Sequence, residues 1–224
     1  MGLSEKRAAW VIKWLEETTS AESVLVRGLV EGLGRLGFAA GVLEYHRPFL
    51  APIYAWTASV PPGAFLELPI MVKLSLKHLL GRFRTGGRMS KCLPIEASKR
   101  ELFRTDASAD DQRSVLGGYE VREYSDTTKA RWFSIALSQK DLPEFFKGDT
   151  AKRTVAAWEM LATLVALKIF STNGSSRETR GLTTVTGATD NQGNPYAINR
   201  LMTTKFPLNV LVMELATMLE EREL

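Results

Sequence analysis

Glu159 is the only charged residue in an apolar stretch that runs from Val155 to Leu167. At helical spacing, Glu159 falls on one stripe with Val155, Ala162, Ala166 and Ile169, so its carboxylate interrupts the face that such a helix would bury. Burying an unpaired carboxylate costs several kcal/mol unless a cation or a hydrogen-bond donor compensates. The alternative is that Glu159 lies at the margin of the stripe and reaches solvent. The fold must therefore either supply a cation or hydrogen-bond donors to this carboxylate or leave it exposed to solvent.

The segments around this helix predict a mixed sheet with helices, of the α+β or α/β class. Three strand-like runs come first and short polar turns join them, which indicates an antiparallel meander. A fourth strand follows the helix and should lie parallel to the first, because the helix provides the crossover. The expected elements are strands at 101–108, 114–124 and 130–137, a helix at 152–170, a strand at 181–188, and helices near 195–202 and 207–223.

The first hundred residues predict a separate helical region. Ser4 can cap a helix that runs to about Glu17, and a second helix begins near Ser20 and stops before Pro48. A third helix is expected over 68–83, and the Gly-Gly pair at 86–87 breaks it. We therefore expect a helical domain at 1–95 and a sheet domain at 96–224, with a boundary between about 85 and 100.

Two further acids complete a candidate metal site. Asp106 lies in the first predicted strand, where Asp is disfavoured, and Asp190 follows the fourth. Taken singly, Asp106 could end its strand and cap a turn, and Asp190 could belong to an ordinary turn. Together, a parallel pair of strands would bring both carboxylates to one sheet edge, beneath Glu159. Such a cluster suits two Mg²⁺ or Mn²⁺ ions, which at about 4 Å apart can drive in-line displacement at a phosphodiester.

The charge is unevenly distributed along the chain. Residues 1–100 carry fourteen Lys and Arg against eight Asp and Glu, a balance of +6, whereas residues 101–224 have a balance of −2. The positive excess is concentrated between residues 70 and 100, which favours contact with a polyanion, although a solubilising linker would have the same composition. The candidate nucleic-acid-binding residues are Lys73, Lys77, Arg82, Arg84, Arg88 and Lys91.

Composition argues against several other classes of protein. No apolar run reaches the roughly 18 residues of a membrane span, and the N-terminus lacks the apolar core of a signal peptide, so we expect no membrane partner. Cys92 is the only cysteine, which excludes an internal disulfide and favours a reducing, intracellular setting, in the nucleus or the cytoplasm.

Several strings resemble the ribonuclease H domain of retroelement reverse transcriptases, in particular the DIRS-like group. They are Phe-Arg-Thr-Asp-Ala-Ser at 103–108, Leu-Gly-Gly-Tyr at 116–119, Ala-Arg-Trp-Phe-Ser at 130–134, Trp-Glu-Met-Leu-Ala-Thr-Leu at 158–164, and, most specific, Thr-Asp-Asn-Gln-Gly-Asn at 189–194. Two upstream strings, at 33–40 and 47–54, resemble the thumb and connection region that precedes the nuclease. The resemblance implies metal ligands at Asp106, Glu159 and Asp190, and cleavage of the RNA strand of an RNA–DNA hybrid.

The chain departs from that family in two respects. It has no polymerase palm, so a polymerase domain encoded elsewhere would be a partner, and it stops where the family continues with a strand and a helix that bear a fourth acidic or His-containing segment. We therefore expect a C-terminally truncated nuclease module, and whether it is an active enzyme is left open. The alternatives are a catalytically degenerate remnant that still binds nucleic acid, and a structural protein whose helical half docks a polymerase subunit.

Overall fold

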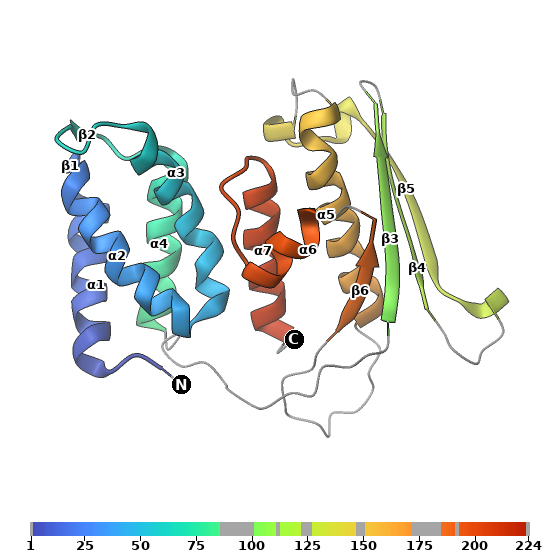
Figure 1. The fold of residues 1–224 in the computed structure, drawn as a ribbon, viewed down its shortest axis with the longest axis horizontal. Coiled ribbons are helices and arrows are strands. Elements are labelled where there is room, and N and C mark those ends of the chain that lie inside the picture. The colour runs from blue at the N-terminus through green and yellow to red at the C-terminus, as the bar shows by residue number, and fades with distance from the viewer. Residues whose placement is uncertain are drawn as a thin grey trace. The chain divides into compact units, whose positions relative to one another are not determined.

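A computed structural model describes residues 2–85, 101–110, 113–121, 127–146, 151–171, 185–190 and 193–222. These residues form seven α-helices, a two-stranded sheet and a four-stranded mixed sheet (Figure 1). The chain divides into two compact units, one of residues 1–92 with 201–204 and the other of residues 93–200 with 205–224. The expected boundary at 95/96 falls outside the described residues. Among the described residues, no helix is both long and apolar enough to cross a bilayer.

The first unit is helical. It contains α1 (Glu5–Ser20), α2 (Val26–Val42), a 3₁₀ segment (Glu44–Leu50), α3 (Ala51–Ser59) and α4 (Ile70–Arg84). A short antiparallel pair, β1 (Val24–Leu25) and β2 (Phe65–Leu66), joins the loops at one end. Its core is mainly aliphatic, with the rings of Phe49 and Phe83, and includes Leu15, Leu33, Leu36, Ile53, Leu76 and Leu79.

One helix of this unit was not predicted. The sequence analysis ended the second helix before Pro48 and assigned no element to the proline-rich stretch after it, whereas the structure ends α2 at Val42 and places α3 over 51–59. Pro52 lies in the first turn of α3, where a helix needs no backbone N–H and tolerates proline. Pro52 is therefore compatible with the start of a helix, and Pro48 lies in the 3₁₀ segment after the end of α2.

The second unit is built on a four-stranded sheet. Strands β3 (Glu101–Ala109), β4 (Arg113–Glu120) and β5 (Trp132–Ser138) form an antiparallel meander. The 20-residue helix α5 (Ala151–Phe170) leads to β6 (Thr186–Thr189), which pairs in parallel with β3. The strand order is β5-β4-β3-β6, and the crossover and the parallel pairing agree with the sequence prediction. Half of the fourth predicted strand, residues 181–184, lies outside the described residues.

Helix α5 packs against β3 and β4 on one face of the sheet, and α6 (Gly193–Arg200) and α7 (Leu208–Arg222) pack against α5 (Figure 1). Two glycines of the sheet make room for aromatic rings. A Cβ on Gly118 would lie 2.6 Å from the ring of Phe133, and one on Gly187 would lie 2.4 Å from the ring of Phe103. Both phenylalanines are buried, so these glycines let large side chains fill the layer between sheet and helix.

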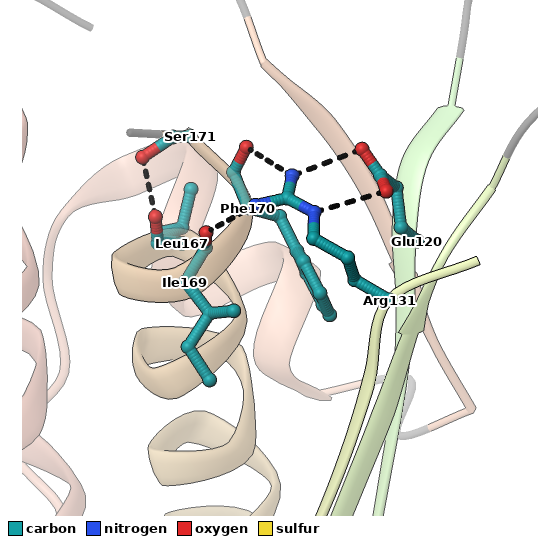
Figure 2. A network of polar contacts seen from close by, with 6 residues as sticks. All are labelled: Glu120, Arg131, Leu167, Ile169, Phe170 and Ser171. Atoms are coloured by element: carbon teal, nitrogen blue, oxygen red, sulfur yellow. Dashed lines mark hydrogen bonds and ion pairs between the residues drawn. The ribbon is translucent and has the colours of Figure 1, made fainter. Parts of the chain in front are cut away.

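Two arginines hold the C-terminal end of α5. The guanidinium of Arg131 donates to the carbonyl oxygens of Ile169 and Phe170, at 3.0 and 3.3 Å, and to both oxygens of Glu120, at 3.1 and 3.0 Å (Figure 2). Arg222 of α7 donates to the carbonyl oxygen of Leu167 at 3.0 Å. The last carbonyls of a helix lack partners within the helix and carry its negative dipole end, so two cations there fix α5 against the sheet and α7.

We predict that Arg131→Met lowers the free energy of unfolding of this unit by about 2 kcal/mol, since it removes the Arg131 hydrogen bonds to a mostly buried carboxylate and to two carbonyls. Urea denaturation measures the effect. Adding Glu120→Gln to that variant should restore part of the loss, because the carboxylate that lost its ion pair with Arg131 is then uncharged. An unchanged urea midpoint for Arg131→Met would show that this cluster does not hold the helix.

Candidate metal centre

Three carboxylates from three elements meet at the edge of β3. Asp106 belongs to β3, Glu159 to α5, and Asp190 follows the last residue of β6 directly. One oxygen of each lies within 4.8 Å of the others. Residues more than eighty positions apart in the sequence are thus neighbours, as the parallel pairing of the two strands required.

The edge is open there because β6 is short. Thr105 and Thr189 are the last paired residues of β3 and β6. The next N–H of β3 that points to this side belongs to Ala107, and it donates to Glu159 Oε1 at 3.2 Å instead of to a strand. The hydroxyl of Thr189 donates to Glu159 Oε2 at 3.0 Å. Each carboxylate oxygen of Glu159 therefore has one donor, and these two donors fix the plane of the group.

Buried hydroxyls lie below this carboxylate. Thr163, one helical turn after Glu159, donates its hydroxyl to the Glu159 carbonyl oxygen at 3.1 Å, and the Thr163 and Thr105 hydroxyl oxygens are 3.4 Å apart. Asn194 at the start of α6 is fully buried and donates to the Ala156 carbonyl at 3.0 Å. This last bond ties the segment that follows Asp190 to the helix that carries Glu159.

The three acids differ in exposure. Glu159 is only 3% exposed, whereas Asp106 and Asp190 are exposed. Burial raises the pKa of the Glu159 carboxyl above its ordinary value of 4.5, and the charges of Asp190 and Asp106 raise it further. The hydrogen bonds from Thr189 and Ala107 lower the same pKa, because they stabilise the ionised form. The site thus combines a fixed, partly desolvated acid with two acids that face water.

This arrangement could hold a divalent cation. All the side-chain ligands are carboxylate oxygens, which suit Mg²⁺ or Mn²⁺. Two oxygens bound to one Mg²⁺ at about 2.1 Å can be no more than about 4.2 Å apart. The observed spacing within 4.8 Å is close to that limit, and the two aspartates are exposed, so a small rotation of their side chains would be needed to bind one ion. A cation there would also cancel the mutual repulsion that raises the Glu159 pKa.

The sequence analysis named all three acids, and the structure brings them together. It missed Thr189, Asn194 and the Ala107 N–H, which orient Glu159 and its surroundings. Thr163 lies four residues after Glu159 and so on the same helical stripe, which was a signal that sequence could have used. Thr189 and Asn194 begin and end the string at 189–194 that carries the resemblance, but nothing in that string indicated the hydrogen bonds that they form.

The basic candidates belong to the other unit and have different surroundings. Lys73, Lys77 and Arg84 fall on one stripe of α4, but Arg84 forms an ion pair with Glu16, Nη2 to Oε1, at 2.6 Å. Lys73 and Arg82 are half-buried, and Lys77 is exposed. Arg88 and Lys91 lie outside the described residues. In the part of the basic segment that the structure describes, Lys77 is therefore the cation best placed to meet a polyanion, and the half-buried Lys73 lies one helical turn before it.

Comparisons of the chain with models of protein families, with curated proteins and with solved structures found no match. The carboxylate centre and the topology that assembles it are therefore the features that indicate a function.

We predict that Glu159→Gln removes a pH-dependent loss of stability. Because the folded pKa of Glu159 is raised, its contribution is most favourable below the unfolded value of 4.5 and is lost as the pH rises through the folded pKa. Without metal, Glu159→Gln should therefore gain stability relative to the wild type between pH 4 and pH 8. Thermal unfolding at several pH values measures this, and a wild-type-like pH dependence would contradict it.

The same variant tests metal binding. Mg²⁺ at about 100 times its dissociation constant should stabilise the wild type by about 2.7 kcal/mol, and should leave Glu159→Gln nearly unaffected. Glu214→Gln, at an exposed position of α7, is the matched control and should respond to Mg²⁺ as the wild type does.

Proposed function

We propose that this chain is a ribonuclease H-like module that hydrolyses the RNA strand of RNA–DNA hybrids in a metal-dependent reaction. The observation that carries the proposal is the cluster of Asp106, Glu159 and Asp190 at one sheet edge. The topology supports it. The sheet has an antiparallel meander and a fourth strand that a crossover helix brings parallel to the first. One acid therefore lies on a strand, one on the helix and one at the end of a strand. These are the positions that the resemblance to retroelement nucleases implies for its metal ligands.

The three acids would have different roles. Glu159 would hold a cation in a fixed place, since its two oxygens are already oriented by Ala107 and Thr189. Asp106 and Asp190 are exposed and would complete the coordination from the solvent side, where a phosphodiester can approach. Two bound Mg²⁺ or Mn²⁺ ions would supply an activated water and neutralise charge on the phosphate oxygens. Neither histidine nor cysteine occurs after residue 100, so no side chain of those types competes as nucleophile or base in this unit.

The basic segment supports a nucleic-acid substrate. A polyanion approaching three carboxylates needs cations elsewhere on the protein to hold it, and Lys73 and Lys77 on α4 offer them. Such contacts to phosphates are independent of sequence and give affinity that falls with salt. The choice of the RNA strand would depend on contacts to its 2′-hydroxyl groups.

We predict that Asp106→Asn abolishes Mg²⁺-dependent cleavage of a labelled RNA–DNA hybrid and leaves hybrid affinity within a few-fold. The cleavage rate should fall by more than about 100-fold, because losing a residue that only supports a metal ligand costs at most about that much. Asp110→Asn, directly after the same strand, is the matched control, because its amide oxygen can still accept from the Arg113 N–H and it lies outside the cluster. Hybrid cleavage that persists in Asp106→Asn would refute the assignment. A wild-type chain that binds the hybrid without cleaving it would instead indicate a degenerate binding module.

We also predict that the double variant Lys73→Gln, Lys77→Gln lowers hybrid affinity about tenfold and reduces the slope of log affinity against log salt by about 2, since each phosphate contact contributes about 0.9. Fluorescence anisotropy at several salt concentrations measures both. The double variant Lys6→Gln, Lys13→Gln on α1 removes the same charge from another exposed surface and should leave the slope near that of the wild type. Equal effects from the two pairs would argue against a specific role for α4.

A further inference from the structure

Strand β5 forms one end of the four-stranded sheet. It pairs with β4 along one edge only, and among the described residues no strand pairs with its other edge. Figure 1 shows β5 as the outermost strand on that side of its unit. The register between β4 and β5 runs without a bulge from 113↔138 to 119↔132.

The backbone groups of the free edge can be identified from the ladder. The N–H of Glu120 donates to the Arg131 carbonyl at 2.9 Å, and in an antiparallel pair the hydrogen-bonded positions alternate. Phe133, Ile135 and Leu137 therefore exchange bonds with β4. The N–H and C=O groups of Trp132, Ser134 and Ala136 point outward, and their side chains lie on the sheet face away from α5. The N–H of Ser138 is satisfied by Asp141 at 2.8 Å, which ends the free edge.

This edge strand lacks the features that prevent the edge strands of two protein molecules from pairing. The strand reads Trp-Phe-Ser-Ile-Ala-Leu-Ser, with no charge, no proline and no glycine. Edge strands of monomeric proteins are commonly protected by an inward-pointing charge, a proline or a bulge. Trp132 is 73% exposed, and Ile135 and Leu137 are half-buried although they point toward the core side. A second strand laid against β5 would cover all three.

We propose that β5 pairs with β5 of a second copy of the chain, antiparallel and about a two-fold axis at Ser134. In this register Ser134 faces Ser134, and Trp132 faces Ala136 of the other copy. The three outward-pointing residues of each strand are all used, and each of the three opposed pairs exchanges two hydrogen bonds. The two four-stranded sheets become one sheet of eight strands.

The strand is self-complementary in this register, which is why we assign the edge to a second copy. A large indole lies opposite a methyl group, two small hydroxyls meet at the axis, and no like charges are opposed. On the helix side, Ile135 faces Phe133 of the other copy. The carboxylate clusters remain accessible at the far edges, because five strand spacings of about 4.8 Å separate the two β3 strands by about 24 Å. The proposal is therefore independent of the nuclease assignment.

The oligomeric state of the full chain tests the proposal. Sedimentation across about three decades of concentration should show a monomer–dimer equilibrium. Ser134→Lys and Ser134→Glu should each weaken the dimer about five- to tenfold, because like charges then meet at the axis. An equimolar mixture of the two variants should dimerise at least as well as the wild type. Ser108→Lys, an exposed position of β3 on the same face, is the matched control and should dimerise normally. A wild type that is monomeric throughout, or variants without effect, would overturn the proposal.

Cysteine cross-linking tests the register. In a Cys92→Ser background, Ser134→Cys should form a disulfide-linked dimer on mild oxidation, since directly opposed hydrogen-bonded residues have Cα atoms about 5.5 Å apart. Ala136→Cys is equally exposed but should cross-link at least tenfold more slowly, because the two copies of residue 136 lie four residues apart along the strands. Equal rates for the two variants, or faster linking at residue 136, would contradict the two-fold pairing at Ser134.

Discussion

The carboxylate of Glu159 is the group around which the second unit is organised. It is buried in the layer between the sheet and α5, yet the two donors that hold it come from β3 and from the end of β6. A desolvated acid that receives one hydrogen bond on each oxygen is tolerated, but burial and the charges of the adjoining aspartates still raise its pKa. A cation bound beside the three acids would favour the ionised form of Glu159 and offset their mutual repulsion.

The rest of the unit places α5 so that Glu159 reaches the edge of β3. Gly118 and Gly187 let the rings of Phe133 and Phe103 fill the space beneath the helix. At the other end, Arg131 and Arg222 hold the last carbonyls of α5 against β4, β5 and α7. The helix is therefore held at its C-terminal end by charge and along its length by packing, which leaves Glu159 little freedom to move relative to the strands.

The sequence predicted the elements that repeat a periodic pattern and missed those that depend on a single contact. The meander, the long helix, the parallel fourth strand and the gathering of Asp106, Glu159 and Asp190 followed from alternation, helical spacing and the geometry of a crossover. Helix α3 was missed because two prolines in its neighbourhood suggested irregular chain, although Pro52 occupies a first-turn position. Thr189 and Asn194 were missed because their roles depend on hydrogen bonds to residues thirty or more positions away.

The brevity of β6 has a consequence for how the centre could come apart. Asp190 directly follows a strand of four residues that, in the part of the chain that the structure describes, pairs only with β3, and short edge segments are where local opening costs least free energy. Detaching β6 would remove both Asp190 and the hydroxyl of Thr189 while the meander and α5 stay folded. An ion bound by all three acids would then link β6 to β3 and α5. Binding of the ion and pairing of the fourth strand would therefore be coupled, so that each stabilises the other.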